Sequence, residues 1–189
     1  MPTTTLYLVR HGEAENNDAT DPALTATGLV QARSTGNVLR STGADLVIHG
    51  TRRRSIESAR AIATALDTAS TQSSDLFEDR TPIPEDWSDV PVRYHASLRD
   101  VPSAEADHGA RRLTQAVEHF SRPGPDDRTI VAVTHTFVFG WFVRSALDAP
   151  WWRWIGLNTA NGAITAIRWS SDRDSRLLSF NERGHLADS

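Results

Sequence analysis

Short apolar runs alternate along this chain with longer segments in which apolar residues recur at every third or fourth position. The short runs predict buried strands, and the longer segments predict helices with one apolar face, because these spacings match the two side-chain periods. The predicted strands are Leu6–Val9, Leu46–His49, Thr129–Thr134, Ala163–Trp169 and Leu177–Phe180. The predicted helices are Leu24–Arg40, Ile56–Leu66, Leu113–Phe120 and Phe137–Leu147.

This alternation of strands and helices predicts the α/β class. Such proteins bury a mostly parallel central sheet between helices on both faces, so we expect a three-layer α/β/α sandwich. With 189 residues the chain is long enough for one sizeable core and short for two, and no internal repeat divides it. We therefore expect residues 1–189 to form a single domain.

One stretch, Thr71–Arg93, interrupts the rhythm. It contains three prolines, and six acidic residues against two arginines. This composition predicts an excursion loop, with a short helical turn near Glu85–Trp87. A long loop in a compact domain is usually either functional or disordered, so the excursion is a candidate source of substrate specificity.

Composition narrows the classes of function. The net charge of −4 and a single short basic run, Arg52–Arg54, argue against a nucleic-acid partner. The chain has no cysteine, which excludes disulfides, thiolate zinc sites and cysteine nucleophiles, and no lysine, which excludes Schiff-base chemistry and a P-loop lysine.

The chain also offers no segment typical of a membrane protein. The most apolar stretch, Thr129–Leu147, contains His135 and Arg144 and is better explained as a strand followed by a helix. No positively charged apolar leader opens the chain, so we expect a cytoplasmic protein without a membrane partner.

Histidines and arginines follow three of the predicted strands. Arg10 and His11 come directly after the first strand, Arg54 lies at the start of the helix after the second, and His135 follows the third. Ligands in open α/β sheets bind beyond the carboxyl ends of the strands, where these side chains meet. Histidine can act as a nucleophile, and the arginine fork matches two phosphate oxygens. Any one of these features alone is more often ordinary surface, but the three together predict a phosphate site in which an imidazole attacks phosphorus.

The same residues fit a known pattern. Val9-Arg10-His11-Gly12-Glu13 with Asn17 resembles the signature of the histidine phosphatases, the superfamily that includes the phosphoglycerate mutases. The resemblance continues through Leu24–Gly28 with Gln31-Ala32, through Arg54–Ala59, and ends at Val133-Thr134-His135. It extends from the first predicted strand to the last predicted helix and implies the same fold and a phosphoryl-transfer activity.

The chain departs from the family pattern in three places. Gly50-Thr51-Arg52 stands where the family often has Ser-Pro-Leu, so Arg53 and Arg54 both qualify as the family's arginine, and the following Ser58-Ala59 favours Arg54. Thr136 follows the second histidine, where the family usually has glycine. The family's middle glutamate motif is best matched by Leu98-Arg99-Asp100, with aspartate in place of glutamate.

The resemblance implies a role for each matching residue. His11 would be the nucleophile and form a phosphohistidine, while Arg10 and Arg54 hold phosphoryl oxygens and His135 donates a further hydrogen bond. The substrate-binding candidates are Asn17, Thr25, Gly28 and Thr136. Because the arginines supply positive charge, we expect neither a metal nor a cofactor.

A carboxylic acid is also needed, to protonate the leaving oxygen and then to activate water. We assign this step to Asp100. The alternatives are Glu105, Glu85 and Glu78.

The leading hypothesis is therefore a metal-independent phosphomonoesterase that acts on a small-molecule phosphate ester. A phosphoglycerate mutase-type phosphotransferase is the first alternative, and the acidic excursion weighs against it because it would repel a bisphosphate. A non-catalytic phosphate-binding domain is the second. The cluster of Trp151, Trp152 and Trp154 could form a homodimer surface or cap the last helix.

Overall fold

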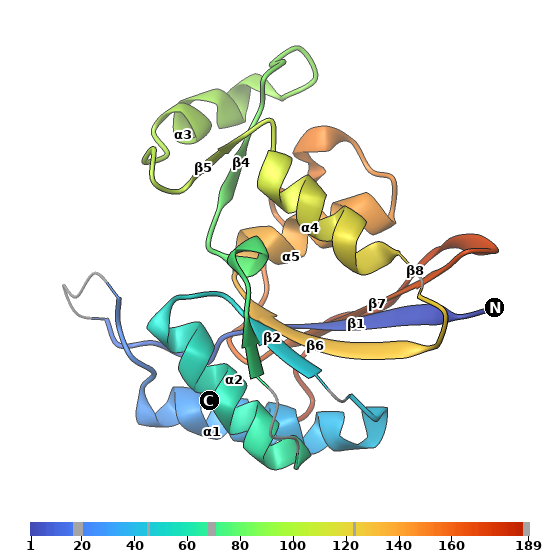
Figure 1. Cartoon of the computed structure of the whole chain (residues 1–189). Coiled ribbons are helices and arrows are strands. Elements are labelled where there is room, and N and C mark those ends of the chain that lie inside the picture. Colours follow the sequence, from blue (N-terminus) through green and yellow to red (C-terminus); the bar gives the residue numbers. More distant parts are fainter. Residues whose placement is uncertain (17–20, 45, 68–70, 123, 187–189) are drawn as a thin grey trace.

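The computed structural model describes residues 1–16, 21–44, 46–67, 71–122 and 124–186. A six-stranded sheet with the strand order β3-β2-β6-β1-β7-β8 forms its centre (Figure 1). The strands are β1 (Thr3–Arg10), β2 (Leu46–His49), β3 (Thr71–Ser73), β6 (Arg128–Thr134), β7 (Ile164–Ser170) and β8 (Arg173–Glu182). The pairs β3–β2, β2–β6 and β6–β1 are parallel, whereas β7 and β8 continue the sheet with antiparallel pairing.

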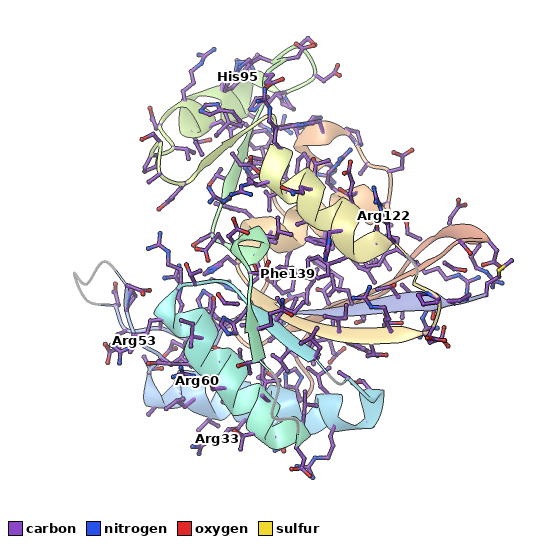
Figure 2. All side chains as sticks on the ribbon, in the orientation of Figure 1. Arg33, Arg53, Arg60, His95, Arg122 and Phe139 are labelled. Carbon is purple, nitrogen blue, oxygen red and sulfur yellow. The ribbon has the colours of Figure 1, made fainter. Side chains whose placement is uncertain are left out.

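Two layers of helices cover the sheet. The helices α1 (Ala26–Leu39) and α2 (Arg53–Leu66) lie on one face, and α4 (Arg111–Ser121) and α5 (Thr136–Ala146) lie on the other (Figure 1). Each face has its own apolar core, with Val9, Val131 and Ile62 in the first and Phe139 and Phe142 in the second. Figure 2 shows Phe139 in the middle of the molecule, where it is fully buried. The predicted three-layer α/β sandwich is thereby confirmed.

The burial of each strand follows its place in the sheet. The central strand β1 is buried on both faces, and it begins earlier than predicted because Thr4 and Thr5 pair with β6 and β7 and are themselves buried. The edge strand β8 instead alternates between exposed and half-buried residues. Apolar runs alone therefore predict the position of the central strands well, but they underestimate the length of strands that contain threonine or lie at an edge of the sheet.

The excursion is more structured than a loop. It contains β3, a single helical turn at Asp75–Phe77, and β4 (Thr81–Ile83), which pairs in parallel with β5 (Ala106–His108). The short helix α3 (His95–Arg99) lies beyond β4 and β5, in the upper part of Figure 1. No helical turn forms over Glu85–Trp87. The chain instead turns just after it, where the N–H of Val90 donates to the carbonyl of Trp87, and the helical turn of the excursion is the earlier one at Asp75–Phe77.

Two glycines bring the loop after β1 against the first turn of α1. A Cβ atom on Gly28 would lie 2.1 Å from the carbonyl oxygen of Glu13, and one on Gly12 would lie 2.3 Å from the carbonyl oxygen of Gly28. Side chains at either position are therefore excluded by backbone atoms. This contact fixes the backbone that carries His11.

The contact at Gly28 leads to a prediction about stability. Alanine is favoured over glycine within a helix, but here the clash is with backbone and cannot be relieved by a side-chain rotation. We expect Gly28→Ala to lower the free energy of unfolding by more than about 2 kcal/mol, measured by urea denaturation. Gly124→Ala is the matched control, because its Cβ would meet no atom closer than 3.4 Å, and its change should stay within about 0.5 kcal/mol. Equal effects of the two substitutions would contradict the prediction.

Candidate active site

Three chain segments bring His11, Arg54 and His135 together at the carboxyl ends of β1, β2 and β6. His11 follows β1, Arg54 is the second residue of α2, and His135 is the N-cap residue directly before α5. The two imidazole rings lie 5.0 Å apart at an angle of 57°. Arg54 lies beside both, with Nε 3.2 Å from Nε2 of His11 and Nη2 3.5 Å from Nδ1 of His135.

Backbone contacts orient the ring of His11. Its Nδ1 lies 2.7 Å from the carbonyl oxygen of Gly12, and a carbonyl can only accept, so the proton of the neutral ring is on Nδ1. The lone pair is then on Nε2, which accepts a hydrogen bond from the Nε–H of Arg54. The backbone of His11 is tied down as well, because its N–H donates to Thr134 and Asn161 donates to its carbonyl. His11 therefore presents a nucleophilic nitrogen toward the arginine.

Both histidines are held neutral. Burial, with added repulsion from His135, Arg54 and Arg10, lowers the pKa of His11 to about 3. Burial and the charge of Arg54 also lower the pKa of His135 well below its usual value. Positive charge at this site is thus confined to the guanidinium groups, and both imidazoles are neutral, with one ring proton each, at neutral pH.

Arg10 lies at the edge of the same cluster. Its guanidinium donates to the carbonyl oxygen of Thr159, and its charge acts on both histidines. Burial lowers the pKa of Arg10, and the negative charge of Asp79 opposes this effect. Asp79 therefore acts on Arg10 through its charge, whereas it contacts Arg54 directly.

Asp79, which is not among the site residues predicted from the sequence, is the carboxylate that contacts both Arg54 and His135. One carboxylate oxygen, Oδ2, lies 2.9 Å from Nη2 of Arg54 and 3.3 Å from Nδ1 of His135. The Asp79 side chain is one-third exposed, so it borders the solvent while it touches the buried pair. Among the described residues, Asp79 is the only one whose carboxylate makes a hydrogen bond or ion pair with the two arginines or the two histidines of the cluster.

Two tertiary contacts place Asp79 there. The hydroxyl of Thr134, at the end of β6, donates to the carbonyl oxygen of Phe77 at 2.9 Å. The same carbonyl passes so close to Gly50 that a Cβ there would lie 2.6 Å from it. Gly50, which replaces the serine of the family pattern, thus makes room for the segment that carries Asp79.

The predicted acid, Asp100, lies elsewhere. It follows α3, which Figure 1 shows apart from the strand ends, and its carboxylate makes no hydrogen bond or ion pair within the described part of the chain. Glu85 pairs with Arg111 and Glu78 accepts the N–H of Thr51, so both are engaged away from the histidines. The carboxylate of Glu105 likewise has no contact with the cluster among the described residues.

The predicted substrate-binding residues are only partly assembled. Asn17 lies outside the described residues. Thr25 is the N-cap residue before α1, and its hydroxyl accepts the N–H of Gly28 at 3.0 Å and donates to the Glu13 carboxylate at 2.7 Å. Thr25 and Gly28 therefore hold the loop after His11. Thr136 is the first residue of α5 and presents a helix N-terminus next to His135.

Arg53 and Arg54 have different environments. Arg54 has a side chain that is only 15% exposed, and it contacts the histidines. Arg53 has a side chain that is 60% exposed and pairs with Glu57, and Figure 2 shows it at the outer surface with Arg33 and Arg60. The structure therefore places Arg54 in the cluster and Arg53 outside it.

The sequence model of the histidine phosphatase superfamily (branch 1) matches residues 6–183. The chain therefore belongs to this superfamily. No curated protein sequence matches it at a significant level.

Solved structures share the fold over almost the whole chain. The Bacillus stearothermophilus protein YhfR superposes with a TM-score of 0.73 at 18% identity, covering 97% of this chain and 100% of that one. A mutant phosphoserine phosphatase from Entamoeba histolytica, in complex with phosphoserine, has a TM-score of 0.69 at 20% identity, with 97% and 100% coverage. A Plasmodium falciparum phosphoglycerate mutase has a TM-score of 0.64 at 18% identity, with 99% and 94% coverage. Phosphatases and mutases thus share this fold. Across the described residues, every helix is too short or too polar to span a bilayer.

The neutral state of His11 makes stability depend on pH. In the unfolded chain His11 has an ordinary pKa of about 6.5 and binds a proton as the pH falls, whereas in the folded protein it stays neutral down to about pH 3. Acid therefore favours the unfolded state. Between pH 7 and pH 5 this one group is expected to reduce the free energy of unfolding by about 2 kcal/mol.

Urea denaturation of the wild type and of His11→Asn at both pH values measures this contribution. The variant should lose about 2 kcal/mol less than the wild type over this range, and the two should respond alike between pH 7.5 and pH 8.5. Identical losses between pH 7 and pH 5 would show that His11 is not held neutral.

Proposed function

We propose that this protein is a phosphomonoesterase that transfers the phosphoryl group of a small-molecule phosphate ester first to Nε2 of His11 and then to water. The observation that carries the proposal is the pairing of an unprotonated His11 Nε2 with the guanidinium of Arg54, 3.2 Å away. The nucleophilic nitrogen of His11 thus lies next to the guanidinium charge that would stabilise the phosphoryl oxygens. A phosphoryl group on Nε2 would lie beside Arg54, with the ring of His135 5.0 Å from that of His11 and the charge of Arg10 acting on the same imidazole.

In the first step, the lone pair on Nε2 attacks phosphorus and the bond from phosphorus to the ester oxygen breaks. The ester binds as its monoanion, whose proton passes to the carboxylate of Asp79 and from there to the leaving oxygen, so that the alcohol departs. Arg54, Arg10 and the N–H of His135 stabilise the charge on the three phosphoryl oxygens. The product is a phosphohistidine with Asp79 ionised.

In the second step, Asp79 accepts a proton from a water molecule whose oxygen attacks the phosphorus. The bond from phosphorus to Nε2 breaks, and the electron pair returns to the imidazole. Asp79 passes this proton on to the departing phosphate, and the neutral His11 and the ion pair of Asp79 with Arg54 are restored. Because arginines supply the positive charge, the cycle uses no metal. The described residues also contain no group of three or more histidine or acidic side chains arranged to hold one.

Charge favours water over a second phosphorylated substrate as the acceptor. The net charge is −4, and Asp79 occupies part of the hydrogen-bonding capacity of Arg54. A bisphosphate would meet this carboxylate and the acidic excursion around it, which supports hydrolysis over a mutase reaction.

The test is hydrolysis of an aryl phosphate in the presence of a chelator, followed by an alkaline quench that preserves phosphohistidine. We expect turnover that the chelator does not change, with labelled phosphate attached to His11 in the quenched protein. Loss of turnover on chelation would contradict the metal-free route. Label that passes to an added phosphoglycerate faster than to water would identify a phosphotransferase, and binding of phosphate without turnover would identify a non-catalytic domain.

A further inference from the structure

The ring nitrogen of His135 that does not face the cluster has a partner of its own. Nε2 of His135 lies 3.2 Å from the hydroxyl oxygen of Ser55, the third residue of α2. Both residues are buried, with Ser55 fully enclosed and His135 only 2% exposed. The hydroxyl and the imidazole therefore meet in a place that bulk water does not reach.

The other nitrogen, Nδ1, has two neighbours with opposite requirements. The carboxylate of Asp79 lies 3.3 Å away and accepts hydrogen bonds, so it favours a proton on Nδ1. The guanidinium of Arg54 lies 3.5 Å away and only donates, so it favours a lone pair on Nδ1. A neutral imidazole carries one proton, and these contacts alone leave its position balanced.

The Ser55 hydroxyl breaks this balance. Its proton must find an acceptor, since an unpaired buried donor is costly, and Nε2 of His135 is the only hydrogen-bond partner of the hydroxyl among the described residues. When Ser55 donates to Nε2, the imidazole proton is on Nδ1. In the opposite arrangement, Nε2–H would donate to the hydroxyl and leave the Ser55 proton without a partner.

We propose that Ser55 is a positioning residue that holds His135 in the Nδ1–H tautomer, so that His135 always presents a hydrogen-bond donor to the phosphoryl group on His11. The consequence for catalysis rests on the proposed function. In the free enzyme this N–H points to Asp79, and during the reaction it binds a phosphoryl oxygen. Without Ser55, the Nε2–H tautomer becomes accessible and turns a lone pair toward those oxygens.

The tautomer can be observed directly, without any turnover. Nitrogen NMR of ¹⁵N-histidine protein distinguishes a protonated from an unprotonated ring nitrogen, and His135→Asn assigns the signals. We expect Nδ1–H in the wild type, a shift toward Nε2–H in Ser55→Ala, and no change in Thr64→Ala. Thr64 is the matched control, because its hydroxyl lies on the same helix but bonds only the carbonyl of Arg60. An unchanged tautomer in Ser55→Ala would overturn the proposal.

Kinetics then test whether the tautomer matters. We expect Ser55→Ala to lower kcat/KM about tenfold, because in part of the protein His135 would then no longer donate a hydrogen bond to the phosphoryl group. In a His135→Asn background, which has no imidazole tautomer, the same substitution should cost less than about twofold. A tenfold loss in both backgrounds would show that Ser55 acts through the fold and not through His135.

A second substitution guards against simple loss of folding. Ser55→Cys is close in size and keeps only a weak donor, so both its tautomer shift and its loss of activity should fall between those of the wild type and Ser55→Ala. Wild-type protein that hydrolyses no phosphate ester, yet shows the tautomer shift in Ser55→Ala, would refute the proposed function and leave the role of Ser55 in orienting His135 intact.

Discussion

Replacing His11 with asparagine is expected to lower kcat for phosphate ester hydrolysis by at least about 10⁴-fold, because it removes the nitrogen that receives the phosphoryl group. Asparagine retains an N–H that can donate to the carbonyl of Gly12, but it has no nucleophilic lone pair toward Arg54. The measurement is steady-state hydrolysis of an aryl phosphate, with an alkaline quench to show that the labelled phosphohistidine is absent.

Two controls separate this effect from loss of the site. The variant should bind inorganic phosphate with a dissociation constant within a few-fold of the wild type, because Arg10, Arg54 and His135 remain. Its thermal unfolding at pH 7.5 should remain cooperative. Activity within tenfold of the wild type would eliminate His11 as the nucleophile and, with it, the proposed reaction.

Replacing Asp79 with asparagine is expected to lower kcat/KM by about 10²–10⁴-fold for an alkyl phosphate, whose alkoxide leaves poorly without a proton. For an aryl phosphate with an acidic phenol the loss in kcat/KM should be much smaller, because such a leaving group departs as an anion. The dependence of the loss on the leaving group is therefore the signature of a general acid.

The same substitution has a second, opposite consequence. Asp79 pairs with Arg54 in the free protein, so a phosphate must compete with this carboxylate for the guanidinium. Asp79→Asn should therefore tighten the binding of inorganic phosphate while it slows catalysis, which isothermal titration would show. Weaker binding would mean that Asp79 supports the anion site in some other way.

Asp100→Asn is the matched control for Asp79→Asn. The carboxylate of Asp100 makes no contact with the cluster in the described part of the chain, so its removal should leave kcat/KM within about twofold. The reverse result, a leaving-group-dependent loss in Asp100→Asn and none in Asp79→Asn, would return the acid to the position that the sequence motif suggested.

Local signals in the sequence predicted the central strands and the three strand ends correctly, because a buried parallel strand needs a continuous apolar run and the run stops where the chain meets solvent. The short elements β4, β5 and α3 were not predicted, since each is only three to five residues long and is stabilised by its neighbours. Their apolar content is too small for periodicity to detect.

What the sequence determined by itself was the α/β fold and the supply of His11, Arg54 and His135 at one edge of the sheet, because apolar spacing sets the strands and parallel strands end together. Which carboxylate joins them was decided only by tertiary structure. Asp79 is one of six acidic residues in its segment, and it reaches Arg54 because Thr134 holds the carbonyl of Phe77 and Gly50 has no side chain to block the approach. The pairing of Ser55 with His135 is of the same kind, since the two residues are 80 positions apart in the chain and meet only when α2 and β6 pack together.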